Sequence, residues 1–325
     1  MEKAEWIAKM VDCLASEEAD LARITEAINL KYEYRPKSVF KYRTVDDNGY
    51  SLQNLEHDCV WVCSPTAYND PFDSSLSISI DVLLKGIIRE GVKNIAESEL
   101  TGQIDPEKLS QILESVNPGL ALQELFMVKD GLSKEDQANY RQWLTVQMDK
   151  YERLATSKLP ESHKESLKIC SFSETPDSII MWSHYADQHR GFCIEYGVED
   201  LPPSDGFVRM LFPVVYSERL FDATRYFQAA IRDRNKFNNL FPTLAALYKS
   251  PEWSYEKEWR LIIPANLARQ AGALRVPKPK AVSLGSRMTE AKRAKVIEIC
   301  KRKGITAFQM SLARDSFCLR SDLVA

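Results

Sequence analysis

The sequence predicts an α+β protein with a mixed β-sheet core, a helical N-terminal arm and helical insertions. Short apolar segments rich in Val, Ile and aromatic residues recur along the chain and are typical of strands. Two long stretches between them, at about residues 80–168 and 219–250, have the apolar spacing of helices. A single sheet interrupted by two helical stretches accounts for this order of elements.

Composition supports an ordinary globular chain. The 325 residues are 44% hydrophobic and 27% charged, with 12 Gly and 15 Pro and a net charge of -3, which excludes a disordered or fibrous protein. No apolar run approaches the roughly 20 residues that span a bilayer, and acidic residues interrupt the first apolar positions, unlike a signal peptide. We therefore expect a cytoplasmic protein without membrane contact, whose seven scattered cysteines are reduced.

The first part of the chain predicts an arm and then the start of the core. Residues 1–36 form the helical arm, in which apolar residues follow helical spacing and Ser16 looks like a cap that restarts the helix. The core covers residues 37–325. It opens with a short strand around 39–42, and a second strand around 59–63 follows before Ser64-Pro65 interrupts regular structure.

The rest of the core alternates between helical stretches and strands. The helical insertion at about 80–168 is followed by a short helix at 182–189, capped by Asp177 or Ser178, and later by a basic helix capped by Ser286. Strands are predicted at 167–173, 191–196, 212–216, 256–264, 281–286 and 305–310.

The first candidate site residue is Arg43, in the predicted strand FKYR. Side chains alternate between the two faces of a strand, so Arg43 shares a face with Val39 and Lys41. A guanidinium can hold a pyrophosphate or a carboxylate through two parallel hydrogen bonds. A structural ion pair is the alternative interpretation.

The second candidate is the serine pair of CSFS. Ser171 and Ser173 are expected on one face of their strand, opposite Cys170 and Phe172. Two hydroxyls on one face can orient a neighbouring carboxylate or contact a ribose. Two solvated serines are the alternative.

The segment MWSHYADQHRG follows these serines and gathers aromatic and titratable groups. Trp182, Tyr185 and His184 offer stacking surface and a group that titrates near neutral pH. His184 and His189 are five residues apart, which is not the spacing that places two imidazoles on one helix face, so no metal site is predicted. A helix packed by its Trp and Tyr is the alternative.

The most specific signature is YEKEWRL. On a strand, Glu256 and Glu258 would share one face with Arg260. Two carboxylates this close are costly unless a positive group uses them. Either Arg260 neutralises them in a structural ladder, or Glu258 bonds a substrate hydroxyl and stabilises a developing cation.

A turn at Asn69-Asp70-Pro71-Phe72-Asp73 is expected at the rim of the same pocket. Asn69 or Asp70 would fix it by bonding backbone amides. Substrate contact, support, or an Asx-turn without any ligand role are the interpretations left open.

These motifs together resemble a known bacterial family. The strings FKYR, SPTAYNDPFD, CSFS, MWSHYADQHRGFCIEY and YEKEWRLIIP, in this order, are similar to the domain-of-unknown-function family DUF2971 over about residues 38–315. The resemblance implies no established reaction. It does imply a relation to proteins found among bacterial stress and anti-phage defence genes.

The order Arg, Ser-x-Ser, Glu-x-Glu also resembles the layout of ADP-ribosyltransferases. That resemblance implies that Arg43 holds the NAD phosphates, that Ser171 or Ser173 supports the glutamate, and that Glu258 bonds the nicotinamide ribose. Glu256 would contact or deprotonate the acceptor. Phe172 departs from the small central residue usual in the serine motif, and the gaps between the motifs are long.

We therefore predict an ADP-ribosyltransferase-like toxin or effector of anti-phage defence. NAD is its expected substrate and a nucleic acid or protein its acceptor, with an antitoxin or another defence-operon protein as partner. Predicted catalytic residues are Glu258, Glu256 and His184, and predicted cofactor-binding residues are Arg43, Ser171, Ser173, Asn69, Trp182 and Tyr185, with no metal.

Two alternatives remain open. A non-catalytic sensor module would bind a nucleotide or protein without turnover. A metal-dependent nuclease would use Asp70, Asp73, Glu256 and Glu258 around a divalent ion. The transferase requires that Arg43, the serine pair and Glu258 meet in one pocket.

Overall fold

A computed structural model describes residues 1–83, 85–86, 106–115, 121, 133–233, 238–268 and 273–324. The predicted helical insertion therefore lies partly outside the described residues, as does a short part of the second helical stretch. Their described parts are mainly helical, although short strands also occur in the second stretch.

An eight-stranded mixed sheet forms the core, in the order β14-β13-β12-β5-β1-β4-β10-β6. Its strands are β1 (Ser38–Arg43), β4 (Leu167–Ser173), β5 (Phe192–Gly197), β6 (Leu211–Pro213), β10 (Glu258–Pro264), β12 (Ala281–Leu284), β13 (Thr306–Leu312) and β14 (Leu319–Leu323). Neighbouring strands are antiparallel except β12 and β13. The predicted α+β class with a mixed sheet is confirmed.

Three two-stranded sheets complete the strands of the described residues. They pair β2 (Cys59–Trp61) with β11 (Ala273–Arg275), β3 (Leu76–Ser77) with β8 (Phe221–Asp222), and β7 (Val215–Tyr216) with β9 (Tyr248–Lys249). The segment FPVVY, expected as one strand, thus divides between the large sheet and a small one. Val214, at the break, bonds through its amide to the Glu258 carbonyl.

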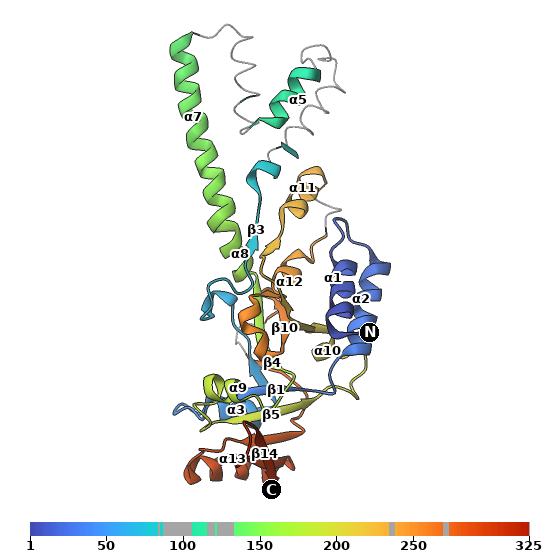
Figure 1. Cartoon of the computed structure of the whole chain (residues 1–325), viewed down its shortest axis with the longest axis vertical. Helices are drawn as coiled ribbons and strands as arrows, with labels where there is room; N and C mark the ends of the chain where they lie inside the picture. The colour runs from blue at the N-terminus through green and yellow to red at the C-terminus, as the bar shows by residue number, and fades with distance from the viewer. Residues whose placement is uncertain are drawn as a thin grey trace.

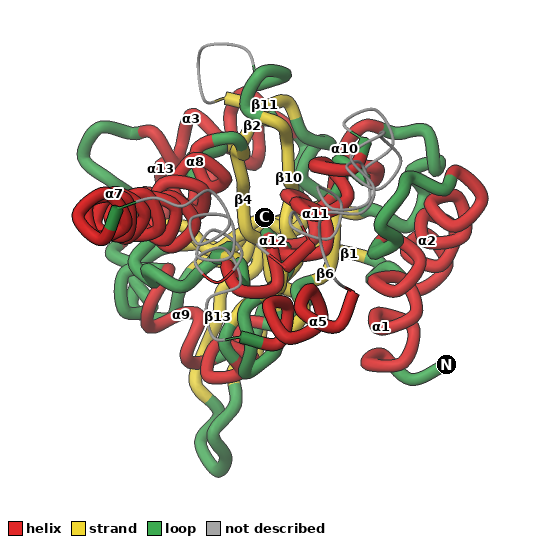
Figure 2. Tube along the Cα trace, turned by 90° about the horizontal axis from the view of Figure 1, so that it is seen from above, coloured by secondary structure: helices red, strands yellow, loops and turns green. Residues whose placement is uncertain are grey.

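Helices flank the sheet along its length (Figures 1 and 2). They are α1 (Lys3–Leu14), α2 (Leu21–Tyr34), α3 (Tyr50–His57), α5 (Pro106–Glu114), α7 (Lys134–Arg153), α8 (Leu159–Glu165), α9 (Ile179–Tyr185), α10 (Gly206–Met210), α11 (Thr224–Arg232), α12 (Phe241–Ala245) and α13 (Glu290–Lys303). Figure 1 shows α1 and α2 side by side against one flank, while α7 projects away from the sheet.

The N-terminal arm is helical as predicted, but its restart lies elsewhere. Asp20, rather than Ser16, caps α2 by accepting hydrogen bonds from the Ala22 and Arg23 amides. The basic helix α13 likewise begins after Thr289 and not at Ser286. The short helix α9 does begin at Ser178, whose hydroxyl accepts from the Met181 amide. Helix α3 and strand β14 were not predicted.

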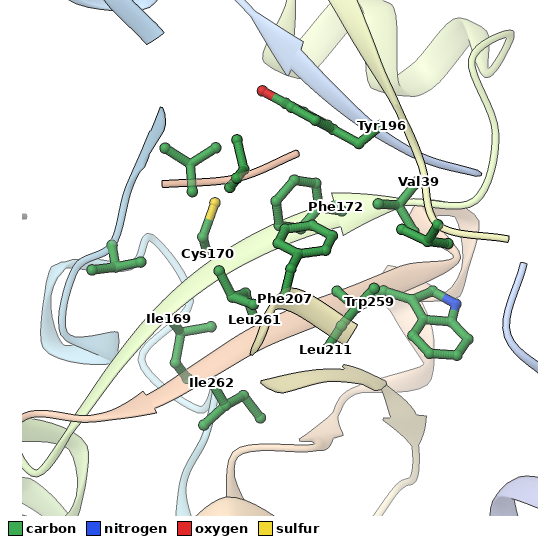
Figure 3. Packing of buried hydrophobic residues seen from close by; sticks show 14 of the residues in the cluster. Val39, Ile169, Cys170, Phe172, Tyr196, Phe207, Leu211, Trp259, Leu261 and Ile262 are labelled. Carbon is green, nitrogen blue, oxygen red and sulfur yellow. The ribbon is translucent and has the colours of Figure 1, made fainter. Parts of the chain in front are cut away.

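The main hydrophobic core lies against β4 and β10. Figure 3 shows Phe172 against Phe207, with Tyr196 above them and Trp259 farther along the sheet. The Phe172 ring meets the rings of Tyr196 and Phe207 edge-on, with centroids 5.8 and 5.5 Å away. Phe172, the departure from the usual serine motif, is therefore a core residue that anchors β4.

Strands β1 and β4 separate after a short contact, and this fork positions the site. They pair at Phe40 and Ser173, whereas β1 pairs with β5 over six residues and β4 with β10 over seven. Figure 1 shows β1 and β5 crossing below the steeply running β4 and β10. Inside the fork, the Lys41 ammonium donates to the Ser171 carbonyl at 2.6 Å.

Gly191 fixes the corner between α9 and β5 beside Arg43. A Cβ at this position would lie 2.0 Å from the Arg43 carbonyl oxygen and 3.0 Å from the Ala186 backbone. Only glycine permits so close an approach of two backbones. The corner therefore holds the end of β1, and with it Arg43, at a fixed place.

Candidate functional site

A cavity of about 300 Å³ opens at the fork between β1 and β4. We call it the fork pocket. Its walls come from the two strands, from the loop after β2, from α9 and from the segment that precedes β10. Seven predicted site residues line it: Arg43, Asn69, Ser171, Ser173, Tyr185, Glu256 and Glu258. The structure thus brings together residues more than 200 positions apart.

Arg43 presents an incompletely satisfied guanidinium to the pocket. One of its terminal nitrogens donates to Asn54 Oδ1 at 2.9 Å. Its Nε is buried and has no hydrogen-bond partner within the described part of the chain. A buried N–H without a partner is costly, and an anionic ligand could supply the acceptor.

The Glu-x-Glu motif was predicted to lie on a strand, but only its second glutamate does. Glu256 ends a 3-10 helix (Pro251–Glu256), Lys257 has a left-handed backbone with φ 44°, and β10 begins at Glu258. The Ser173 hydroxyl donates to the Glu256 carbonyl at 2.7 Å and holds this turn against β4. Glu256 does not alternate with Glu258 along a strand, because the left-handed Lys257 separates the 3-10 helix from β10.

The two carboxylates nevertheless meet, because both contact Lys249. Its ammonium lies 2.5 Å from Glu256 Oε2, 2.9 Å from Glu258 Oε2 and 3.6 Å from Asp73 Oδ2. Three of the four acids that the nuclease alternative would use therefore surround the Lys249 ammonium. Among the described residues, no group of His, Cys, Asp and Glu has the arrangement of a metal site.

Arg260 lies behind this cluster and is fully buried. Its guanidinium grips Glu258 through Nε and Nη2, at 2.9 and 3.1 Å, and reaches Asp73 through Nη2 at 2.6 Å. The remaining donors reach Ser74 Oγ and the Ala246 carbonyl. Glu258 therefore has the Arg260 partner expected for a structural ladder, although this ladder is buried rather than solvated.

The charges around the two carboxylates shift their pKa values in opposite directions. Burial opposes ionisation of Glu258, but Arg260 and Lys249 outweigh it and hold the pKa of this carboxyl below its ordinary value. Burial, and then the negative charge of Glu258, raises the pKa of Glu256. Glu258 is thus the fixed anion, and Glu256 is the carboxylate better suited to take up a proton.

The serine pair supports these carboxylates from β4. A hydrogen bond from Ser171 contributes to the lowered pKa of Glu258. Ser173 acts on the backbone of Glu256, as described above, and is fully buried. Ser171 therefore acts on a neighbouring carboxylate, as one interpretation expected, whereas Ser173 holds the backbone. The alternative of two solvated serines does not hold, because Ser173 is fully buried.

Helix α9 contributes one predicted residue to the pocket and keeps two outside it. The Tyr185 hydroxyl donates to Glu256 Oε1 at 2.5 Å. His184 is exposed and meets the Tyr255 hydroxyl at 3.3 Å, outside the residues that line the pocket. Trp182 is fully buried, stacks on His189 and meets Tyr42 edge-on, so it serves as core and not as a stacking surface for a ligand.

The Asn-Asp-Pro-Phe-Asp turn lies at the rim as predicted. Asp70 Oδ1 accepts from the Phe72 amide at 2.8 Å and forms the Asx-turn. Asn69 and Asp73 line the pocket, and Asp73 is buried against Arg260. The turn thus supports the charged cluster directly, which exceeds the role of an isolated surface turn.

Acid should destabilise the folded protein through His163, which supports this turn. His163 Nε2 meets the Ser74 carbonyl at 3.1 Å, and burial lowers the pKa of this imidazole to about 4. Below its ordinary value of 6.5 only the unfolded chain takes up the proton, so stability should fall by about 3 kcal/mol as the pH drops from 6.5 to 4. Urea unfolding at several pH values measures this loss.

The His163→Gln variant should lose most of that pH dependence. Exposed His57 provides the matched control, because His57→Gln should keep the wild-type slope. Equal slopes in His163→Gln and wild type would contradict the assignment.

Two residues of the pocket were missed from the sequence. Lys41 lies on β1 two residues before Arg43, and burial lowers the pKa of its ammonium. Alternation had placed it on the Arg43 face, which was a usable signal. Lys249 stands at the end of a segment expected to be helical, only seven residues before Glu256. No periodic pattern links it to the carboxylates, which it meets through the fold of the intervening 3-10 helix.

Comparisons with known proteins give one family match, over part of the chain. Residues 181–261 match the family model described as "Protein of unknown function (DUF2971)". This range holds most of α9, Lys249, both glutamates and Arg260. No curated protein and no solved structure matches the chain. Among the described residues, no helix has both the length and the apolar character needed to cross a membrane.

Proposed function

We propose that this chain, whose residues 181–261 match the DUF2971 family model, is an ADP-ribosyltransferase. It transfers ADP-ribose from NAD to a macromolecular acceptor, and the fork pocket binds the NAD.

One observation carries the proposal: the three motifs lie on three adjacent strands and face one pocket. Arg43 is on β1, Ser171 on β4 and Glu258 on β10, in that order across the sheet. The resemblance to ADP-ribosyltransferases assigns these residues to the NAD phosphates, to support of the glutamate and to the ribose. A sheet that had separated the motifs would have ended this interpretation.

The charges of the pocket suit the chemistry of NAD. The C1′–N bond of the nicotinamide ribose breaks with its electron pair passing to nicotinamide, which leaves an oxocarbenium-like ribose. A carboxylate held ionised beside C1′ stabilises that charge. Glu258 is such a carboxylate, because Arg260 and Lys249 keep it ionised and fix its position. Arg43 and Lys41 supply positive charge for the phosphates.

The experiment that tests the proposal measures the transfer of a label from NAD to an acceptor. The purified chain is incubated with NAD labelled in its adenine ring and with protein, RNA and DNA acceptors. Transfer of the label to one acceptor class supports the proposal. NAD that binds but stays intact under all conditions contradicts it.

Arg43→Lys should weaken NAD binding about tenfold, because the lysine ammonium cannot make the two parallel hydrogen bonds by which a guanidinium binds a pyrophosphate. The dissociation constant from calorimetry measures this change. Arg302→Lys, on exposed α13, is the matched control and should leave the affinity unchanged. Equal affinities of Arg43→Lys and wild type would place the phosphates elsewhere.

A second candidate is a nucleotide-binding module without turnover, which the Arg260–Glu258 pair favours. Arg260 already occupies both oxygens of Glu258. A carboxylate saturated in this way can shape a binding pocket without taking part in a reaction. Binding of NAD with no cleavage and no transfer would favour this module over the transferase.

The biological role stays a prediction. The family resemblance implies a toxin or effector in anti-phage defence, with an antitoxin or another protein of the same operon as partner. Expression of the chain with and without its operon neighbours, followed by growth measurement, tests that role.

A further inference from the structure

Strand β14 forms one edge of the eight-stranded sheet, and Figure 1 shows it at one end of the molecule. Four of its five residues are exposed, and no other strand of the described residues pairs with its outer side. At the opposite edge, β6 is buried or half-buried and contains Pro213. An exposed edge presents unpaired N–H and C=O groups to which a further strand can bond. The β14 edge is therefore open to pairing.

The ladder between β13 and β14 determines which backbone groups of β14 point outward. The Val324 amide donates to the Ala307 carbonyl, and the register continues without a break to the turn. Bonded pairs alternate along an antiparallel ladder, so Arg320 and Asp322 direct their backbone groups at β13. The residues whose N–H and C=O groups face outward are Leu319, Ser321 and Leu323.

The sequence of β14, LRSDL, is complementary to itself about Ser321. When a second copy lies antiparallel with its outward groups opposite these, Ser321 faces the partner's Ser321 and Leu319 faces the partner's Leu323. Arg320 then stands opposite the partner's Asp322, and two-fold symmetry repeats this pair. These are non-hydrogen-bonded positions, at which opposing side chains come closest and opposite charges stabilise the pairing.

The same two charges reject the neighbouring registers. Outward groups must stay opposite outward groups, so the next register in either direction sets Arg320 against the partner's Arg320 or Asp322 against the partner's Asp322. Like charges directly opposite each other destabilise a strand pair. Charges on an edge strand usually prevent pairing altogether, whereas this arrangement permits one register.

Both charged side chains are available for such a contact. Arg320 meets Asp315 at 3.6 Å, where both side chains are more than half exposed. Asp322 Oδ2 accepts a hydrogen bond from the Ser311 hydroxyl at 3.4 Å. Exposed pairs of this kind contribute little free energy, so the single chain does not hold either group firmly.

We infer that β14 pairs with β14 of a second copy of this chain, antiparallel and about a two-fold axis at Ser321. The two sheets then form one continuous sheet, in which Leu323, 69% exposed in the single chain, packs beside the partner's Leu319. Two strands of five residues bury less than the roughly 1,200 Å² of a standard interface, so the dimer dissociates in the micromolar range. The inference goes beyond the proposed function, because β13, β12 and β5 separate this edge from the fork pocket.

Sedimentation velocity of the full chain at about 1 to 500 µM tests the pairing. The wild type should change from monomer to dimer over this range. Arg320→Asp and Asp322→Arg should each stay monomeric, because each sets like charges opposite each other. The double exchange Arg320→Asp, Asp322→Arg should dimerise like the wild type, because opposite charges face each other again.

A mixture of the two single variants distinguishes specific pairing from a loss of folding. In the mixed dimer every aspartate faces an arginine, so variants that are monomeric alone should sediment together as a dimer. Arg275→Asp, exposed on the short strand β11, is the charge-matched control and should dimerise like the wild type. A wild type that is monomeric at every concentration would overturn the inference. So would a dimer that Arg320→Asp leaves unchanged, or a mixture that stays monomeric.

Discussion

Glu258→Gln should lower the rate of ADP-ribose transfer by a hundredfold to a thousandfold. The amide keeps the shape of the carboxylate but loses the charge that faces the developing ribosyl cation. Removing one such electrostatic partner costs about 3 to 4 kcal/mol of transition-state stabilisation. Affinity for NAD should change little, because Arg43 and Lys41 are unaltered. Single-turnover kinetics with labelled NAD measures the rate.

Two controls accompany this variant. Thermal unfolding shows whether Glu258→Gln folds, since the change also removes charge from the buried cluster with Arg260. Glu195→Gln alters a carboxylate of the same sheet outside the fork pocket and should retain wild-type turnover. Full activity in folded Glu258→Gln would remove this residue from the reaction and favour the binding module.

Arg260→Leu should lower the free energy of unfolding by about 3 to 5 kcal/mol. The guanidinium is fully buried and partners both Glu258 and Asp73. Its removal leaves two buried carboxylates that share only Lys249, and an unpaired buried charge is costly. Urea unfolding at neutral pH measures the loss.

Arg293→Leu is the matched control for this substitution. Arg293 pairs with Glu290 on the surface of α13, where an ion pair contributes about 0 to 1 kcal/mol. A loss in Arg260→Leu no larger than in Arg293→Leu would show that the buried cluster does not stabilise the fold.

Local patterns predicted most of the sheet because its strands carry their own signals. Apolar and aromatic runs such as those of β1, β4, β5 and β10 are typical of strands and can be recognised from the local sequence. Alternation also separated Arg43 from Tyr42 correctly, since the Tyr42 ring packs against Trp182 while the Arg43 guanidinium bonds Asn54. Strand β14, short and largely exposed, carries no such signal.

Features that depend on tertiary contacts leave no signal in the local sequence. The turn at Lys257 takes Glu256 off the strand, and no periodic pattern marks a left-handed residue. Lys249 acquires its importance only where the fold sets it among three carboxylates. Trp182 has the composition of a ligand-stacking residue, yet its position on the inner face of α9 buries it. The order of the motifs therefore predicted the pocket, but it did not predict which residues line the pocket and which belong to the core.

Calorimetric titration of the purified chain with NAD is the most direct test of the fork pocket as an NAD site. We predict saturable binding of one NAD per chain well below millimolar concentration, weakened about tenfold in Arg43→Lys. No detectable heat up to millimolar NAD, with the chain folded, would contradict the account.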